Sequence, residues 1–138
     1  MFLKLSTVYK YGLLYCCSCS HEQFFAAILI VSPLEDTCVE IYRVNGDDYE
    51  KMKDEYLPLT YQTYLYTSPF GEDLSGYFVN SSKPIAVYGG HACAFVPEGR
   101  FFCDHVVEQI APVSELGNLH VVPPIIGRDP NAGYAFRL

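Results

Sequence analysis

Two histidines and two cysteines form a symmetric set in the second half of the sequence, which reads His91-Ala-Cys93 and Cys103-Asp-His105. Two sulfur and two nitrogen ligands suit tetrahedral zinc. Structural zinc sites, however, usually separate paired ligands by roughly two to four residues. Here a single residue separates His from Cys in each pair. On a strand the two side chains of a pair then lie on the same face, where they have limited freedom to reach a common metal ion. A zinc site at His91, Cys93, Cys103 and His105 is therefore the minor alternative.

A disulfide between Cys93 and Cys103 is the main prediction for this region. The two cysteines enclose nine residues that include Pro97, Glu98 and Gly99, a composition that turns the chain back on itself. In the chain-entropy model a loop of this size stabilises the fold by roughly 3 kcal/mol, much of it by restricting the unfolded state. Two buried free thiols are the remaining interpretation of this pair.

A catalytic group is conceivable here, with Cys103 as nucleophile and Asp104, His105 and Glu108 as acids and bases. A nucleophile and its base must meet by folding, however, and neighbours on an extended chain point to opposite faces. Asp104 and Glu108 more simply accept hydrogen bonds from backbone donors in an irregular loop. The sequence therefore predicts no catalytic residue, no cofactor and no enzyme activity.

The elements that must position these residues have the composition of strands. Twelve Tyr and nine Phe occur together with many Val, Ile and Thr, which favours β-structure. Turn signals recur about every ten residues, as in sandwiches. We therefore predict an all-β, antiparallel β-sandwich-like domain. Strands are expected at residues 24–31 (central in its sheet), 37–44, 61–67, 77–79, 85–88, 119–122 and 134–138.

Three segments between these strands carry more specific signals. Asn45-Gly46 indicates a tight type I′ hairpin turn. The charged residues 47–55 are expected as a helical turn or an exposed arm, and residues 106–110 as a short strand or a single helical turn. The sequence stops inside the last expected strand, so we predict a fragment of a larger domain.

Candidate surface features are fewer. Asn80-Ser81-Ser82 is a glycosylation sequon in a predicted loop. The Tyr-rich residues 49–66 are expected to cover a sheet, with an adhesive surface as the alternative. Cys38 is expected to be a small core residue.

Charge and hydropathy exclude two classes of protein. The net charge is -7 and the nine Lys and Arg are scattered, whereas a nucleic-acid surface requires clustered cations. The longest apolar run, residues 24–31, is far shorter than the roughly twenty residues of a membrane-spanning helix. The sequence predicts neither a nucleic-acid partner nor a membrane span.

The six cysteines favour an oxidising compartment, and hence a secreted, extracellular protein. Residues 1–23 are interpreted as a signal peptide, or as an unstructured or misannotated start. Cys16, Cys17 and Cys19 are accordingly expected to be removed with the signal peptide or to be an artefact of a misplaced start.

The motifs of this chain resemble the N-terminal domain of the IgGFc-binding protein family. The resemblance is carried by Lys-Pro-Ile-Ala-Val at 83–87, Cys-Asp-His-Val-Val-Glu-Gln at 103–109, Pro112, Gly117 and Val-Val-Pro-Pro at 121–124. Ser-Pro-Leu-Glu-Asp-Thr at 32–37, the run 59–66 and Asp-Leu-Ser-Gly at 73–76 extend it upstream. Residues 24–138 are therefore identified as a partial domain of this family.

The resemblance implies a class of large, secreted, multidomain proteins, one of which binds the Fc portion of IgG. For this chain it implies a non-catalytic extracellular module that takes part in adhesion, in mucus or matrix assembly, or in immune recognition. The expected partner is an extracellular protein or glycoprotein. Residues 103–109 would then have a structural role.

Overall fold

The protein is a two-layer β-structure, which confirms the predicted all-β, sandwich-like fold. The computed structural model describes residues 2–4, 25–68, 74–94, 102–117, 119, 121 and 126–127. In chain order the elements are β1 (Phe2–Lys4), β2 (Ala26–Ser32), β3 (Thr37–Asn45), β4 (Asp48–Leu57), β5 (Gln62–Thr67), β6 (Tyr77–Ser81), β7 (Ala86–Ala94), β8 (Asp104–Gln109) and the 3₁₀ turn η2 (Val113–Glu115). No helix in this part of the chain has the length and apolar character needed to cross a bilayer.

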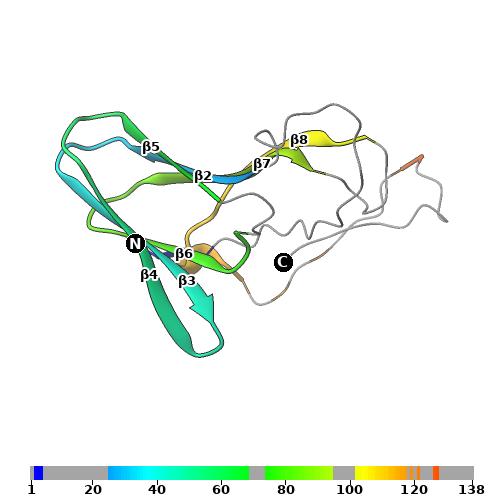
Figure 1. Cartoon of the computed structure of the whole chain (residues 1–138), viewed down its shortest axis with the longest axis horizontal. Helices are drawn as coiled ribbons and strands as arrows, with labels where there is room; N and C mark the ends of the chain where they lie inside the picture. The colour runs from blue at the N-terminus through cyan, green and yellow to red at the C-terminus, as the bar shows by residue number, and fades with distance from the viewer. Residues whose placement is uncertain are drawn as a thin grey trace.

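Two antiparallel sheets of four strands form the layers (Figure 1). Sheet A has the strand order β1-β6-β3-β4, and sheet B has the order β5-β2-β7-β8. β3 and β4 form one hairpin and β7 and β8 another, while the remaining connections pass between the sheets. β2 lies between β5 and β7, so the prediction that this strand is central is confirmed.

The core lies between the sheets and follows from alternation along each strand. In β2, Ile28 and Ile30 are fully buried, whereas the residues that alternate with them, Ala27, Leu29 and Val31, are only partly covered. The other sheet contributes Val39, Ile41 and Val79, each no more than 1% exposed. A side-chain period of two therefore gives each sheet one face that excludes water and one that remains available for contacts.

Cys38 is exposed, so the expectation that it is a core residue is wrong. The alternation that turns Val39 and Ile41 inward necessarily turns Cys38 outward, on the same face as Glu40. Its thiol is free and lies on the outer surface of sheet A.

The hairpin turn between β3 and β4 falls one residue later than predicted. Asn45 is paired with Asp48, which leaves Gly46 and Asp47 as the two loop residues. Gly46 has a φ of 66°, and among the two loop residues it alone has a positive φ. A positive φ at the first loop position only is the pattern of a type II′ turn rather than the predicted type I′.

All of the charged residues 47–55 except Asp47 lie in strand β4 and form no helical turn. This strand projects with β3 as a long arm, the other alternative predicted for the segment (Figure 1). Beyond Cys103 the chain forms strand β8, one of the two alternatives predicted there. Leu119 and Val121 belong to no regular element. The remainder of the strand expected at 119–122, the strand expected at 134–138, and Cys16, Cys17 and Cys19 lie outside the described residues.

Candidate functional site

The hairpin of β7 and β8 is closed by a disulfide between Cys93 and Cys103, with Cα atoms 5.1 Å apart. This confirms the predicted pairing. The ladder between the two strands shifts register between His91 and Ala94, so an irregularity lies immediately beside the bridge. The bond thus joins the two strands at the end of the ladder where regular pairing is interrupted.

The four residues of the zinc alternative are not brought together as free ligands. Both sulfurs are consumed by the disulfide. His91 faces the interior and is 2% exposed, whereas His105 is exposed on β8. In the described part of the chain no group of three or more His, Cys, Asp or Glu residues could hold a metal ion.

His91 accepts a hydrogen bond from the backbone of its own strand. Its Nδ1 accepts a hydrogen bond from the backbone N–H of Cys93 at 3.0 Å, which places the proton of the neutral ring on Nε2. The carboxylate of Asp104 likewise accepts a hydrogen bond from a backbone N–H, that of His105, at 2.9 Å. This is the role predicted for Asp104, but Asp104 and Glu108 lie in strand β8 and not in the expected irregular loop.

A surface hollow of about 550 Å³ lies on the outer face of sheet A. Its lining combines carboxylates, an amide, hydroxyls, a thiol and one aromatic ring, from strands β3, β4 and β6 and the residue after β6. The lining residues are Cys38, Val39, Glu40, Asp54, Glu55, Tyr56, Asn80, Ser81 and Ser82.

Strand register places the polar side chains of the hollow in one row. Glu40 on β3 is paired with Asp54 on β4 and with Asn80 on β6. Directly opposed residues of antiparallel strands project on the same side with closely spaced Cβ atoms. The row therefore arises from three strands that are distant in sequence.

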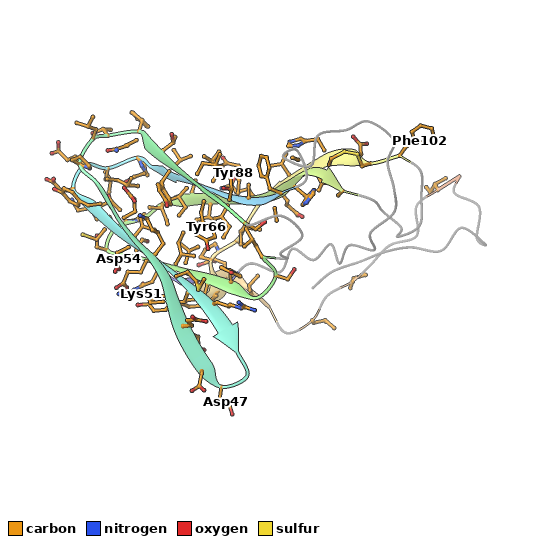
Figure 2. The ribbon with its side chains drawn as sticks, in the orientation of Figure 1. Asp47, Lys51, Asp54, Tyr66, Tyr88 and Phe102 are labelled. Atoms are coloured by element: carbon orange, nitrogen blue, oxygen red, sulfur yellow. A yellow bond between two sulfur atoms is a disulfide. The ribbon has the colours of Figure 1, made fainter. Side chains whose placement is uncertain are left out.

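Lys51 links the acidic members of this row. Its Nζ lies 2.6 Å from Oε1 of Glu40 and 3.0 Å from Oδ1 of Asp54, and the amide of Asn80 donates to Oε2 of Glu40 at 2.8 Å. These hydrogen bonds from Lys51 and Asn80 lower the pKa of Glu40. The hydrogen bonds that Lys51 donates to Glu40 and Asp54 raise the pKa of Lys51. Figure 2 shows Lys51 and Asp54 along β4, outside the space between the two sheets.

Tyr56 forms the aromatic rim of the hollow and is 53% exposed. Its hydroxyl donates to the carboxylate of Asp36, which raises the pKa of Tyr56. The phenol is thus held in one orientation with its ring available. An aromatic ring beside ordered carboxylate and amide groups suits recognition of a polar partner surface.

Some tyrosines of residues 49–66 cover a sheet and others are exposed on the surface. Tyr64 and Tyr66 pack against the core as partly buried side chains of β5, with the rings of Tyr66 and Tyr77 6.1 Å apart. Tyr49, Tyr56 and Tyr61 are exposed. The first group covers a sheet, and Tyr56 contributes to the hollow.

Sequence reasoning missed the hollow and misplaced Asn80. Asn80 lies in strand β6 and not in a loop, with its side chain partly covered and bonded to Glu40. The alternation of residues 37–44 does indicate that Glu40 faces outward, but its partners can be identified only once the register with β4 and β6 is known.

Comparison with known proteins identifies a family for most of this chain. The family model described as IgGFc binding protein matches residues 15–138. The human "IgGFc-binding protein" is 47% identical over 53 residues, an alignment that covers 38% of this chain and 1% of that protein. The chain thus spans a very small part of the relative that it matches, and no solved structure matches it.

Proposed function

This chain belongs to the IgGFc binding protein family, and on that premise we propose that it is a non-catalytic, extracellular binding module within a larger secreted protein. Residues 24–138 would form part of the family's N-terminal domain, together with strand β1, which pairs with β6 in sheet A. The disulfide between Cys93 and Cys103 supports an oxidising compartment, because such bonds form and persist outside the cytosol.

The observation that carries the binding proposal is the hollow on sheet A. Glu40 and Asp54 are held in place by Lys51, and Tyr56 by Asp36. A surface whose side chains are already ordered loses less conformational entropy when a partner binds. The exposed ring of Tyr56 adds contact area of the kind that is enriched at binding hot spots.

The partner that we propose is an extracellular protein or glycoprotein, in a setting of mucus, matrix or immune recognition. Glu40, Asp54 and Tyr56 are each at least partly exposed in the hollow, and their polar groups suit the polar surface of such a partner. Because a relative is named for binding the Fc portion of IgG, an IgG Fc fragment is the natural first probe. A secreted mucin-type glycoprotein is the second.

Surface plasmon resonance with these two probes tests the proposal on the full chain. Tyr56→Ala removes the rim of the hollow, and we expect it to weaken binding of the probe about tenfold or more, as for a hot-spot residue. Tyr49→Ala is the matched control, because Tyr49 is also an exposed tyrosine of β4, 64% exposed. It lies about 23 Å along the strand from Tyr56.

Loss of binding in Tyr56→Ala with retention in Tyr49→Ala supports the proposal. Equal affinities for the wild-type protein and Tyr56→Ala would place the contact elsewhere. Failure of both probes to bind the wild-type chain would contradict the proposed partner class.

A further inference from the structure

Strand β5 is an unusual edge of sheet B. Among the described residues, each of the two sheets ends in two edge strands, namely β1 and β4 in sheet A and β5 and β8 in sheet B. Edge strands expose unpaired backbone groups, and proteins commonly protect them with charged side chains. β4 carries Lys51, Lys53 and Asp54, and β8 carries Asp104 and Glu108, while the short β1 ends at Lys4. Among these four edges, β5 is the one without a charged residue.

Five of the six residues of β5 also form a palindrome. Residues 63–67 read Thr-Tyr-Leu-Tyr-Thr, so the strand reads the same in both directions about Leu65. A two-fold axis that relates two antiparallel strands brings each residue opposite its mirror position in the sequence. At this edge the opposed side chains would therefore be chemically matched along the strand.

The hydrogen-bonding pattern shows which backbone groups of β5 face outward. Ser68 donates its backbone N–H to the carbonyl of Ala26 at 2.9 Å, and the register continues antiparallel from this pair. Bonding and non-bonding pairs alternate in an antiparallel ladder. Tyr64 and Tyr66 thus direct their backbone groups to β2, and Thr63, Leu65 and Thr67 direct theirs to the open edge.

The side chains of these three residues leave the edge accessible. All three are exposed, and Leu65 is 54% exposed. Leu65 also continues an apolar row across the outer face of sheet B, because it is paired with Leu29, which in turn is paired with Tyr88. Figure 1 shows β5 at the margin of its sheet, beside β2.

We propose that β5 pairs with β5 of a second copy of this chain, antiparallel about a two-fold axis at Leu65, so that sheet B continues across the dimer. Leu65 would lie opposite the partner's Leu65, and Thr63 opposite the partner's Thr67. The outward backbone groups of all three residues then pair with one another. Opposed Thr pairs are favourable in sheets, and no like charges meet.

A second copy fits this edge better than an unrelated strand, because the palindrome makes each side chain meet a matched one under a single two-fold operation. The interface is self-complementary, as a two-fold dimer requires. Strand β4 is less suited to pairing with its own copy. Its Lys and acidic residues would have to be placed so that every positive charge lies opposite a negative one.

The mass of the full chain in solution, measured by size-exclusion chromatography with light scattering, tests the dimer. We expect the wild-type protein to have twice the mass of one chain at high micromolar concentration. Leu65→Lys and Leu65→Glu should each halve this mass, because the two-fold axis brings position 65 against itself. An equimolar mixture of the two variants should recover the dimer. Val107→Lys on β8 is the matched control, since Val107 is an exposed apolar residue of another edge, 63% exposed, and it should remain dimeric.

Cysteine cross-linking tests the register in a background in which Cys16, Cys17, Cys19 and Cys38 are each replaced by Ser, so that only the disulfide-bonded Cys93 and Cys103 remain. Opposed Cα atoms in a bonded antiparallel pair are about 5.5 Å apart, within disulfide reach. Leu65→Cys should therefore form a covalent dimer on oxidation that the parent does not form. Thr63→Cys alone should not, because its two copies would be offset by about 13 Å along the paired strands. A monomeric wild-type protein, an unchanged mass for Leu65→Lys, or a Lys and Glu mixture that stays monomeric would each overturn the proposal.

Discussion

A Cβ atom added to Gly90 would lie 2.5 Å from the backbone carbonyl oxygen of Val106, and 3.3 Å from the Cα of Val107. Gly90 is on β7 and is paired with Val107 on β8. The contact is with backbone, which cannot rotate away as a side chain would. The absence of a side chain at position 90 therefore sets how closely the two strands of the disulfide-closed hairpin approach.

Gly90→Ala should destabilise the protein. The added methyl group must displace β8, and overpacking of this kind typically costs about 1–3 kcal/mol. Urea unfolding followed by circular dichroism measures the loss. Gly117→Ala is the control, since its nearest neighbours are 3.9 Å from the added atom, and it should change stability by less than about 0.5 kcal/mol. Equal losses in both variants would show that the close approach is not the cause.

Removal of the disulfide should also lower stability. The bridge closes a short loop, with a sequence separation of 10, so the double variant Cys93→Ser, Cys103→Ser should lose roughly 3 kcal/mol of unfolding free energy. Urea midpoints measured with and without reductant provide the check. Cys38→Ser should unfold like the wild-type protein, because Cys38 is exposed and unbridged. An unchanged midpoint in the double variant would contradict the structural role of the bridge.

Glu40 should make stability depend on pH in the acid range. Its pKa is lowered from 4.5 by the hydrogen bonds from Lys51 and Asn80, so its ionised form favours the folded state above pH 4.5. This contribution is lost as pH falls through the lowered pKa of the folded state. Glu40→Gln should accordingly be less stable than the wild-type protein at pH 7, and the difference should vanish in acid. The effect should be small and sensitive to salt, because the pair is exposed. Urea midpoints across pH that run parallel for the two proteins would refute it.

Glycosylation of Asn80 remains a prediction that the structure makes more specific. Asn80 faces outward beside Glu40, so a glycan on its Nδ2 would project over the hollow. In protein secreted from eukaryotic cells, peptide N-glycosidase should lower the mass of the wild-type protein and of Ser82→Thr, which preserves the sequon. Ser82→Ala should show no such change. A wild-type mass that the enzyme does not alter would show that partial burial in β6 prevents modification.

The parts of the fold that were predictable from sequence rest on local signals. The apolar run that became β2, the alternation at Val39 and Ile41, and the pairing of Cys93 with Cys103 were each predicted from neighbouring residues in the sequence. The β3 to β4 turn was located to within one residue, because Gly46 is the residue that accepts a positive φ without strain.

The candidate site was not predictable in the same way. Glu40, Asp54 and Asn80 meet because of the register of three strands, and no local pattern encodes which residues of distant strands are opposed. β4 was harder to identify as a strand, since its charged residues suit an edge but weaken the usual composition signal.

Hydroxyl-radical footprinting of the full chain, with and without a saturating IgG Fc fragment or mucin-type glycoprotein, tests the binding surface most directly. The measured quantity is the oxidation rate of individual exposed side chains. We predict slower oxidation of Tyr56 and Cys38 in the complex and an unchanged rate for Tyr49. Unchanged oxidation of Tyr56 in the presence of a bound probe, or no binding of either probe, would contradict the account.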